Sequence, residues 1–265
     1  MTILLVGAGR MGSALLKGWL DRGVKSIAVV EPKPSAQLRK LAKAKKVALF
    51  AAPPAVKRKP LVCVVAIKPQ VLKGEAATLA EFAQGGALMI SIAAGTSIAA
   101  LTQAWGHKAR IIRAMPNTPG AIGQGITGIY AAKGVTAADK KRATSLLAAL
   151  GETVWVAKEE LIDSVTAVSG SGPAYLFLMA EALTEAGVAE GLPRDQAEKF
   201  ARATVSGAGA LLAADKSPAS ALREAVTSPG GTTAAALYVL MAEDGLMPLM
   251  KRAVRAARKR AEELA

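Results

Sequence analysis

Cysteine and histidine each occur once in this sequence of 265 residues. A zinc site needs several Cys, His or carboxylate ligands, and a Ser-His-Asp triad needs a histidine beside its nucleophile. His107 lies in a Gly-His-Lys turn, where we expect it to be exposed, so we expect neither a metal site nor such a triad. Cys63 lies in the apolar run 61–67, and we expect it to be buried in a strand and unpaired. This cysteine usage favours a reducing compartment, the cytoplasm.

Aromatic residues and long apolar segments are also scarce. The longest run without charge, residues 82–107, contains glycines and polar residues, and it predicts a strand, a turn and a helix instead of a membrane span. Residues 1–7 lack the basic start of a signal peptide and predict a strand. Aromatics make up 4% of a chain that is 52% apolar, which favours closely packed helices over a β-sandwich.

Acidic residues are outnumbered, because 34 Lys and Arg stand against 20 Asp and Glu for a net charge of +14. The basic residues cluster at 33–46, 57–59 and 251–260. These clusters lack interleaved aromatics and match no base-reading motif. We therefore expect solvated faces that favour anionic ligands, and no nucleic-acid partner.

The N-terminus carries a dinucleotide fingerprint. An apolar run at 3–6 precedes Gly7-Ala8-Gly9-Arg10-Met11-Gly12, and a helical pattern follows at 13–20. In a strand–G-x-G-x-x-G–helix unit, the first glycine permits the tight turn, the second admits the pyrophosphate and the third packs the helix on the strand. Glu31 ends the next predicted strand, where such folds place an acid for the ribose hydroxyls.

The cofactor preference stays open at this stage. Glu31 favours NADH, because a carboxylate repels the 2′-phosphate of NADPH. Lys33 and Ser35 follow at once, with Arg39 one helical turn later, and these side chains favour the phosphate.

Strands and helices continue to alternate as far as residue 160. Further strands are predicted at 61–67, 87–92, 109–115, 122–131 and 152–157, and helices at 70–82 and 135–150. Pro69 suits the first turn of the helix at 70–82. Ala93 and Ala94 follow a strand, where small residues leave room for a flat ring. We expect an α/β fold: residues 1–160 form a Rossmann-like, doubly wound nucleotide domain.

Residues 161–265 predict only helices, at 161–169, 172–186, 193–213, 219–226 and from 232 onwards with a break near Gly245. Ser171 is the expected N-cap of the second of these helices. That helix is apolar on all sides and must be enclosed, so we expect an all-α dimerisation domain.

The stretch 226–233 joins two of these helices. Its Ser228-Pro229-Gly230-Gly231-Thr232-Thr233 sequence breaks one helix and opens the next, which leaves backbone N–H groups for an anion such as a carboxylate. The alternative interpretation is an ordinary turn with a threonine N-cap.

Five motifs in this order resemble the Δ1-pyrroline-5-carboxylate reductase family: GAGRMG at 7–12, AIKP at 66–69, RAMPNTP at 113–119, SGSGPAY at 169–175 and SPGGTT at 228–233. The resemblance covers essentially the whole chain, and its last two motifs are the specific ones. It implies a hydride transfer from NADPH or NADH to the C=N carbon of a cyclic imino acid, which yields L-proline in the last step of proline biosynthesis. It also implies a homodimer, with dimers assembled into a ring.

The resemblance assigns roles by position. The pyrophosphate is expected on residues 7–12, and the ribose and nicotinamide on Ile67, Lys68, Pro69, Ala93 and Ala94. The substrate carboxylate is expected on Ser228, Gly231, Thr232 and Thr233, and the substrate ring on Glu159 and Thr166.

Thr166 is the one candidate for a direct catalytic contact, as a hydrogen-bond donor to the ring nitrogen. The alternative for Thr166 is a helical threonine bonded to its own backbone. The alternative interpretation of Glu159 is a residue in the first turn of its own helix, where the helix dipole favours a negative charge. A protonated imine accepts hydride without a strong protein acid, which suits a site that lacks histidine.

Other functions compete with this prediction. One alternative is another imine reductase or a β-hydroxyacid-dehydrogenase-like enzyme. Enzymes of the β-hydroxyacid-dehydrogenase type typically carry a catalytic lysine on a helix after the sheet, and residues 168–181 contain no lysine. A non-catalytic NAD(P)-sensing module is the other, although a sensor has no need of a second anion cradle.

Overall fold

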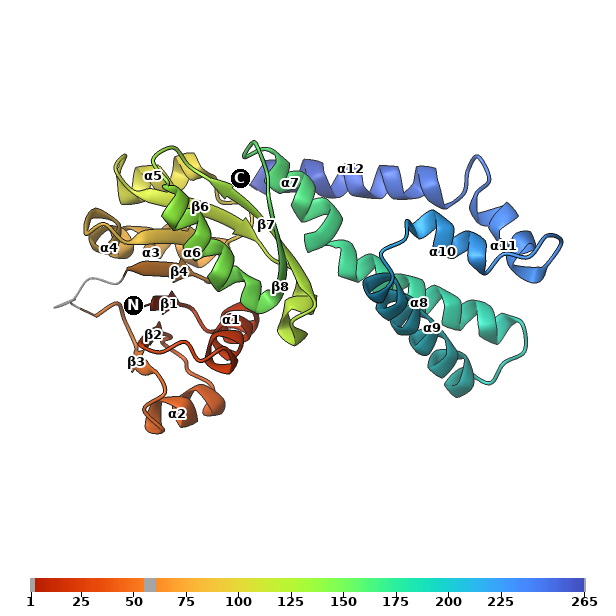
Figure 1. Cartoon of the computed structure of the whole chain (residues 1–265), viewed down its shortest axis with the longest axis horizontal. Helices are drawn as coiled ribbons and strands as arrows, with labels where there is room; N and C mark the ends of the chain where they lie inside the picture. Colours follow the sequence, from red (N-terminus) through yellow and green to blue (C-terminus); the bar gives the residue numbers. More distant parts are fainter. Residues whose placement is uncertain (1–2, 55–60, 265) are drawn as a thin grey trace. The chain divides into compact units, whose positions relative to one another are not determined.

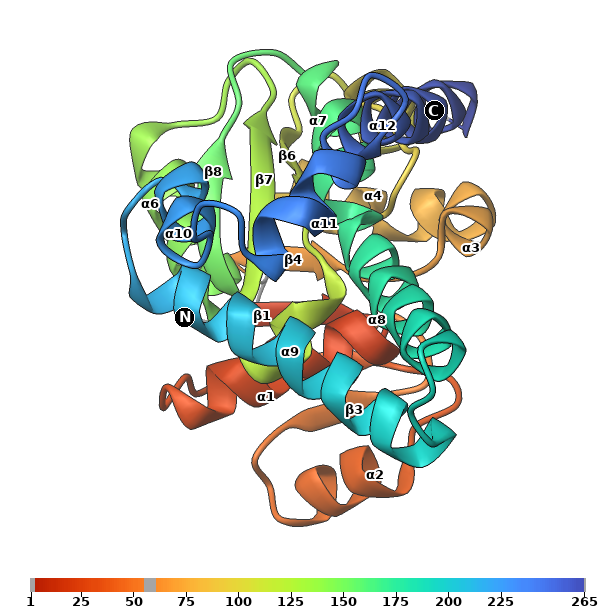
Figure 2. The same ribbon diagram turned by 90° about the vertical axis from the view of Figure 1, so that its right-hand side faces the viewer.

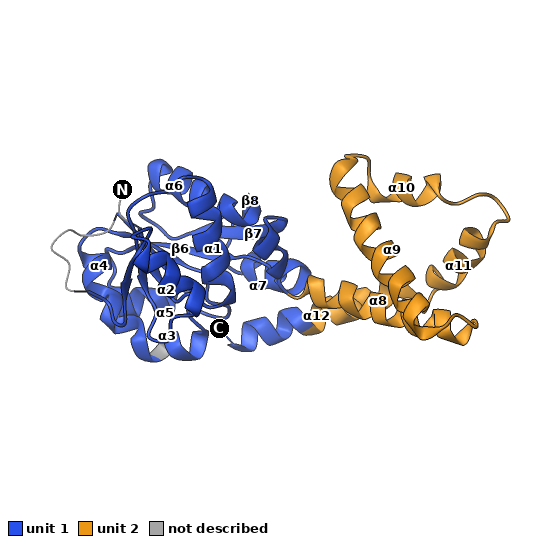
Figure 3. Ribbon diagram, turned by 90° about the horizontal axis from the view of Figure 1, so that it is seen from below, with its two compact units in different colours: residues 1–170, 257–265 blue, residues 171–256 orange. Residues whose placement is uncertain are grey.

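The computed structural model describes residues 3–54 and 61–264, and it divides into two compact units. Unit 1 comprises residues 1–170 and 257–265, and unit 2 comprises residues 171–256 (Figure 3). The basic cluster at 57–59 lies outside the described residues. The domain division expected at residue 160 stays a prediction.

Unit 1 contains an eight-stranded sheet in the order β3-β2-β1-β4-β5-β6-β7-β8 (Figure 1). The strands are β1 (Ile3–Val6), β2 (Ile27–Val30), β3 (Ala48–Phe50), β4 (Val62–Val65), β5 (Leu88–Ser91), β6 (Arg110–Met115), β7 (Gly125–Ala131) and β8 (Gly151–Trp155). Strands β1 to β6 pair in parallel, whereas β7 runs antiparallel to β6 and parallel to β8. The strand order reverses between β1 and β4, where doubly wound sheets bind dinucleotides.

Helices cover both faces of this sheet. One face packs against α1 (Arg10–Asp21), α2 (Ala36–Lys43) and α6 (Ala137–Leu147), and the other against α3 (Pro69–Glu75), α4 (Ala80–Gln84) and α5 (Ile98–Trp105). The short 3-10 turns are η1 (Ala76–Leu79), η2 (Thr118–Ile122) and η3 (Ala148–Leu150). The expected doubly wound α/β class is therefore confirmed.

A buried tryptophan anchors each helical layer. Trp19 of α1 donates its indole N–H to the carbonyl of Leu146 on α6 at 2.8 Å. Trp105 of α5 donates to the carbonyl of Ala76 at 2.9 Å on the other face. Because a buried indole N–H needs an acceptor, each bond fixes how two helices meet.

Two expected helices are shorter than predicted. The single helix at 70–82 is wrong, because the chain forms α3, η1 and α4 there. The break lies at Ala76, where η1 begins and the carbonyl of Ala76 accepts the indole N–H of Trp105. The helix at 135–150 ends at Leu147 and tightens into η3 before β8.

Unit 2 consists of helices. They are α8 (Gly172–Ala189), α9 (Arg194–Ala214), α10 (Ala219–Ala225), α11 (Thr232–Leu240) and the first part of α12 (Leu246–Leu264), whose last turns belong to unit 1. α8 and α9 form a hairpin that turns at Gly191, where φ is +95°. Figure 2 shows α8 beside α9.

Unit 2 buries very little of its own apolar surface. Among residues 171–256, only Thr184, Ala197 and Ala201 are buried. Phe177 on α8 is 64% exposed and Tyr238 on α11 is 84% exposed. Apolar surface of this extent marks a contact with another molecule, as expected for the apolar helix at 172–186.

Candidate active site

The glycine loop after β1 has the geometry of a pyrophosphate site. Gly7 has φ +91°, and a Cβ there would lie 2.6 Å from Cγ2 of Ile67. A Cβ on Gly12 would collide with the carbonyl oxygen of Gly7. A Cβ on Gly9, by contrast, would meet no atom within 4 Å. The fold therefore requires Gly7 and Gly12, whereas Gly9 leaves an open cradle for a ligand.

Glu31 directly follows β2 and turns its carboxylate toward this loop. Its Oε2 accepts the N–H of Ala8 at 2.8 Å, and its Oε1 accepts the N–H of Lys33 at 3.1 Å. Its own N–H bonds the carbonyl of Phe50 on β3 at 2.9 Å. Two backbone donors thus hold the acid where a Rossmann fold binds the ribose.

Lys33 and Ser35 lie just beyond that acid. Ser35 is the N-cap of α2, and its hydroxyl oxygen accepts the N–H of Leu38 at 3.2 Å. The side chains of Lys33 and Arg39 are exposed. The predicted phosphate partners are therefore a helix N-terminus and two exposed cations.

The remaining predicted cofactor residues follow β1, β4 and β5. Arg10 and Met11 begin α1, and Lys68 precedes Pro69 at the first position of α3, as the sequence predicted for this proline. Ala93 is buried, and its N–H bonds Oγ of Ser91 at 3.3 Å. The parallel alignment of these strands brings all of these residues, with Ile67 and Ala94, to one edge of the sheet.

Glu159 joins this edge to the segment before α7 (Leu161–Val165). Its Oε1 accepts the N–H of Ile98, the first residue of α5, at 2.7 Å. The same oxygen accepts Nη1 of Arg113 at 3.2 Å. Arg113 is 3% exposed and bonds Asp163 at 2.9 Å through Nη2. Glu159 thus caps a helix remote in sequence, and the alternative of a first-turn residue in its own helix is wrong.

Thr166 opens a single π-helical turn, Thr166–Gly170, that continues α7. Its hydroxyl donates to the carbonyl of Ile162 at 2.8 Å, which is the alternative that the sequence left open. Its lone pairs stay available to a donor. Gly170 lies close to Met115, since a Cβ there would be 2.7 Å from the methionine Cε. Inserted π turns are frequent at functional sites.

Ser171 occupies the expected N-cap position of α8, but its side chain does not cap the helix. Ser171 has helical backbone angles, and its side chain makes no capping hydrogen bond. The π turn leads directly into α8, so the helix has no free N-terminus to be capped.

The predicted carboxylate cradle lies at the start of α11. Gly230 has φ +70°, and Gly231 is the N-cap in an extended conformation. The first helical bond runs from the N–H of Ala235 to the carbonyl of Gly231 at 3.1 Å. The N–H groups of Thr232 and Thr233 precede that bond, so helix geometry gives them no intrahelical acceptor. The alternative of a threonine N-cap is wrong.

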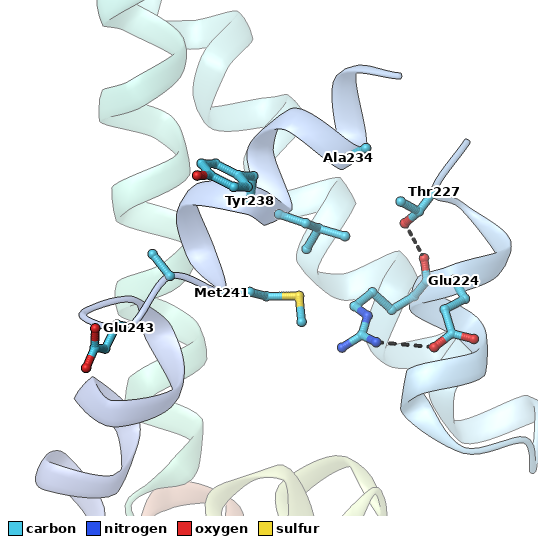
Figure 4. A pocket seen from close by; sticks show the side chains of 9 residues that line it. Glu224, Thr227, Ala234, Tyr238, Met241 and Glu243 are labelled. Carbon is cyan, nitrogen blue, oxygen red and sulfur yellow. Dashed lines mark hydrogen bonds and ion pairs between the residues drawn. The ribbon is translucent and has the colours of Figure 1, made fainter. Parts of the chain in front are cut away.

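A largely apolar groove lies beside the same loop. It has a volume of about 590 Å³ between α10 and α11. Figure 4 shows Tyr238 of α11, and Met241 just after that helix, across from Glu224 and Thr227. The hydroxyl of Thr227 donates to the carbonyl of Arg223 at 2.6 Å and is therefore turned away from α11. Gly231, Thr232 and Thr233 do not line this groove, so it is distinct from the cradle.

Cys63 and His107 have the burial and the exposure that the sequence predicted for them. Cys63 is buried in β4, and burial raises the pKa of its thiol to about 12. His107 is exposed. Within residues 3–54 and 61–264, no helix is long and apolar enough to cross a membrane.

Comparisons with known proteins agree with this arrangement. A family model described as pyrroline-5-carboxylate reductase dimerisation matches residues 159–264, and one described as NADP oxidoreductase coenzyme F420-dependent matches residues 2–95. The pyrroline-5-carboxylate reductase of Pseudomonas aeruginosa is 38% identical over 99% of this chain and 96% of its own.

Solved structures give the same result. The pyrroline-5-carboxylate reductase of Coxiella burnetii has a TM-score of 0.91 and 35% identity, covering 100% of this chain and 98% of that one. The Plasmodium falciparum pyrroline carboxylate reductase, with NADP bound, has a TM-score of 0.82 and 27% identity over 100% and 98% of the two chains. The match to a dimerisation model also supports the expected assembly with a second copy.

Proposed function

This chain belongs to the pyrroline-5-carboxylate reductase family, and we propose that it reduces Δ1-pyrroline-5-carboxylate to L-proline, the last step of proline biosynthesis. The observation that carries the proposal is the bond from Ile98 to Glu159. This bond joins the end of the loop at 93–97, which borders the expected nicotinamide site, to the segment that carries Thr166. The bond thereby holds a loop of the proposed cofactor site and the candidate substrate contact Thr166 together within unit 1.

The residues of the glycine loop fit a dinucleotide. The open space over Gly9 accepts a pyrophosphate, and the N-terminus of α1 stabilises its charge. Ile67, Lys68 and Pro69 with Ala93 and Ala94 border the ribose and nicotinamide in this proposal. Bound NAD(P)H supplies the hydride that the C=N carbon accepts.

NADH is the preferred cofactor in this proposal. Glu31 is held by the N–H groups of Ala8 and Lys33, so a 2′-phosphate would have to lie beside a fixed carboxylate. Like charges about 4 Å apart repel by about 1 kcal/mol in water and by about 4 kcal/mol near a protein surface. Ser35 already accepts the Leu38 N–H, and Lys33 and Arg39 are exposed, so they compensate only weakly.

The substrate carboxylate binds at the start of α11. The N–H groups of Thr232 and Thr233 and the hydroxyls of the two threonines are its donors. The N–H of Gly231 donates to the carbonyl of Ser228 at 3.0 Å, so Gly231 and Ser228 shape the turn that presents these donors. The helix dipole favours the negative charge. Binding of the carboxylate orients the imine, and orientation is the main contribution that a site without a strong acid makes.

Thr166 contacts the ring nitrogen as an acceptor. Its proton is engaged with the Ile162 carbonyl, whereas the nitrogen of a protonated imine carries the N–H. The donor role that the sequence suggested is therefore reversed in this proposal. The carboxylate of Glu159 lies nearby in the chain and is 24% exposed on its side chain, which suits a group that faces a cationic ring.

The assembly is a homodimer formed through unit 2, and a ring of dimers is its proposed higher form. The exposed apolar side chains of α8 and α11 supply the contact surface. A cytoplasmic location belongs to the same proposal, because reduced nicotinamide cofactors are regenerated there.

Turnover of the purified protein tests this function. Racemic pyrroline-5-carboxylate is offered with NADH or NADPH, cofactor oxidation is followed by absorbance, and L-proline is identified by chiral chromatography. We expect L-proline with both cofactors and faster turnover with NADH. If both cofactors bind and neither is oxidised, the chain is another imine reductase or a sensor.

A further inference from the structure

Arg113 is a buried cation in the middle of unit 1. It lies in β6 in register with Ser91 on β5 and Tyr130 on β7, and it is only 3% exposed. An ionised side chain is stable at such a position only if it is paired and hydrogen-bonded. The groups that pair with the Arg113 guanidinium therefore indicate the role of this residue.

The guanidinium of Arg113 bridges two carboxylates. Nη1 donates to Oε1 of Glu159 at 3.2 Å, and Nη2 donates to Oδ1 of Asp163 at 2.9 Å. The Glu159 oxygen also accepts the Ile98 N–H at 2.7 Å. The cluster contains two negative charges and one positive charge, and the N-terminus of α5 offsets part of the surplus.

Each partner belongs to a different wall of the proposed site. Ile98 begins α5 directly after the loop at 93–97, which borders the expected nicotinamide. Asp163 lies three positions before Thr166, so it fixes the last α-helical turn before the π turn. Val165 packs closely against Gly128 of β7, since a Cβ on this glycine would lie 2.7 Å from Cγ1 of Val165. This contact leaves the turn no room to shift toward β7.

We propose that Arg113 is a positioning residue that sets the distance between the hydride donor and the imine carbon. The inference rests on the proposed function. Arg113 contacts neither ligand, because it is buried and both of its terminal nitrogens are engaged. It acts through Glu159 and Asp163, which it holds at a fixed spacing.

Arginine suits this role because its planar fork presents two donors in a rigid geometry. A lysine at the same place keeps the charge but is a single point donor on a flexible stem. Arg113→Lys therefore preserves the burial of a cation and releases the spacing between the two carboxylates. The variant separates positioning from charge.

The test compares Arg113→Lys with the wild type in steady-state kinetics, using C4-deuterated and ordinary reduced nicotinamide. We expect kcat to fall roughly 10-fold to 100-fold, since a misplacement near 1 Å has an effect of this size. We also expect an unchanged dissociation constant for the cofactor and a larger primary isotope effect on kcat. A purely structural role would lower the folded fraction and leave the isotope effect unchanged.

Arg110→Lys is the matched control. Arg110 lies on the same strand and bonds both oxygens of Asp139, at 2.7 and 2.8 Å, away from the proposed site. It should lose stability without a change in kcat or isotope effect. If Arg113→Lys does not fold, Asp163→Asn tests the same spacing from the other side and should raise the isotope effect too.

Two results would be decisive in different ways. A folded Arg113→Lys or Asp163→Asn variant with wild-type kcat and isotope effect overturns the positioning role. A wild-type protein that binds cofactor and never reduces the imine overturns the proposed function instead.

Discussion

The carboxylate of Glu31 accepts the N–H of Ala8 at 2.8 Å, which ties the end of β2 to the glycine loop after β1. The bond places a fixed negative charge beside the open cradle at Gly9. The two hydroxyls of a ribose can donate to such a carboxylate, whereas a 2′-phosphate cannot. We therefore expect the choice between NADH and NADPH to depend on this side chain and its backbone partners.

Replacing Glu31 should reverse the cofactor preference. In Glu31→Ser the repulsion is gone and a hydroxyl can donate to the phosphate, so we expect the NADPH-to-NADH ratio of kcat/KM to rise at least about tenfold, equivalent to about 1.4 kcal/mol. Lys33→Ala tests the opposite contribution and should weaken the binding of NADPH but not of NADH. A ratio that neither change alters would place the adenosine ribose elsewhere.

Gly9 should tolerate a side chain in the fold but not in the complex. A Cβ there meets no atom within 4 Å and φ is −66°, so Gly9→Val should keep nearly the wild-type melting temperature. Its side chain fills the pyrophosphate cradle, and cofactor binding by fluorescence titration should disappear. Gly12→Val is the contrast, since it collides with Gly7 and should destabilise the protein itself. Retained binding in Gly9→Val would move the pyrophosphate away from this loop.

Thr233→Val should raise KM for the imino acid. The change removes one hydroxyl of nearly equal volume, and a hydrogen bond to a charged group contributes about 1.5–3 kcal/mol, equivalent to about 10-fold to 100-fold in KM. The cofactor dissociation constant should not change. Thr227→Val is the control in the same loop, because that hydroxyl bonds the Arg223 carbonyl. Equal KM values in both variants would contradict the carboxylate cradle.

A charge on α8 should weaken the assembly. Phe177 is 64% exposed in a single chain, and burial of an unpaired cation at an interface is strongly unfavourable. Phe177→Lys should therefore shift sedimentation toward the monomer at micromolar protein. Lys141→Glu, on the exposed side of α6, should leave the distribution unchanged. An unaltered oligomer in Phe177→Lys would place the interface on another surface.

Acid should destabilise the protein through Asp139. Burial alone raises the pKa of this carboxyl, but hydrogen bonds from Thr136 and the charge of Arg110 outweigh it and the pKa is lowered. A pKa that is lower in the folded state contributes stability above the unfolded value, about 3.9, and this stability is lost as pH falls further.

Asp139→Asn should remove that contribution. Because Asp139 is buried and paired with Arg110, we expect a loss of about 3 kcal/mol in the free energy of unfolding at neutral pH. Denaturant melts at several pH values provide the measurement. The difference from wild type should shrink in acid, and a constant difference would contradict the ion pair as its source.

Local sequence patterns predicted the nucleotide half of the fold well. The glycine spacing at 7–12, the acid at 31 and the proline at 69 depend on backbone geometry within a few residues, and the structure has each element in its expected place. The apolar runs located all the strands of the sheet except β3. That strand has only three residues, too few to show a period.

What the sequence did not reveal depends on distant partners. Arg113 and Asp163 are 50 positions apart, so nothing local marks them as a pair. A charged residue inside an apolar strand was the one available signal. The side chain of Ser171 makes no capping bond for a related reason. The π turn before it continues the helical backbone into α8, and the local pattern could not show this turn.

The most direct test of the reaction is to follow the hydride itself. Reduced nicotinamide deuterated at C4 is incubated with the protein and pyrroline-5-carboxylate, and the product is examined by mass spectrometry and NMR. The proposed function predicts L-proline with a single deuterium at C5, the former imine carbon. Oxidised cofactor without deuterated proline, or no proline at all from a protein that binds both ligands, would contradict it.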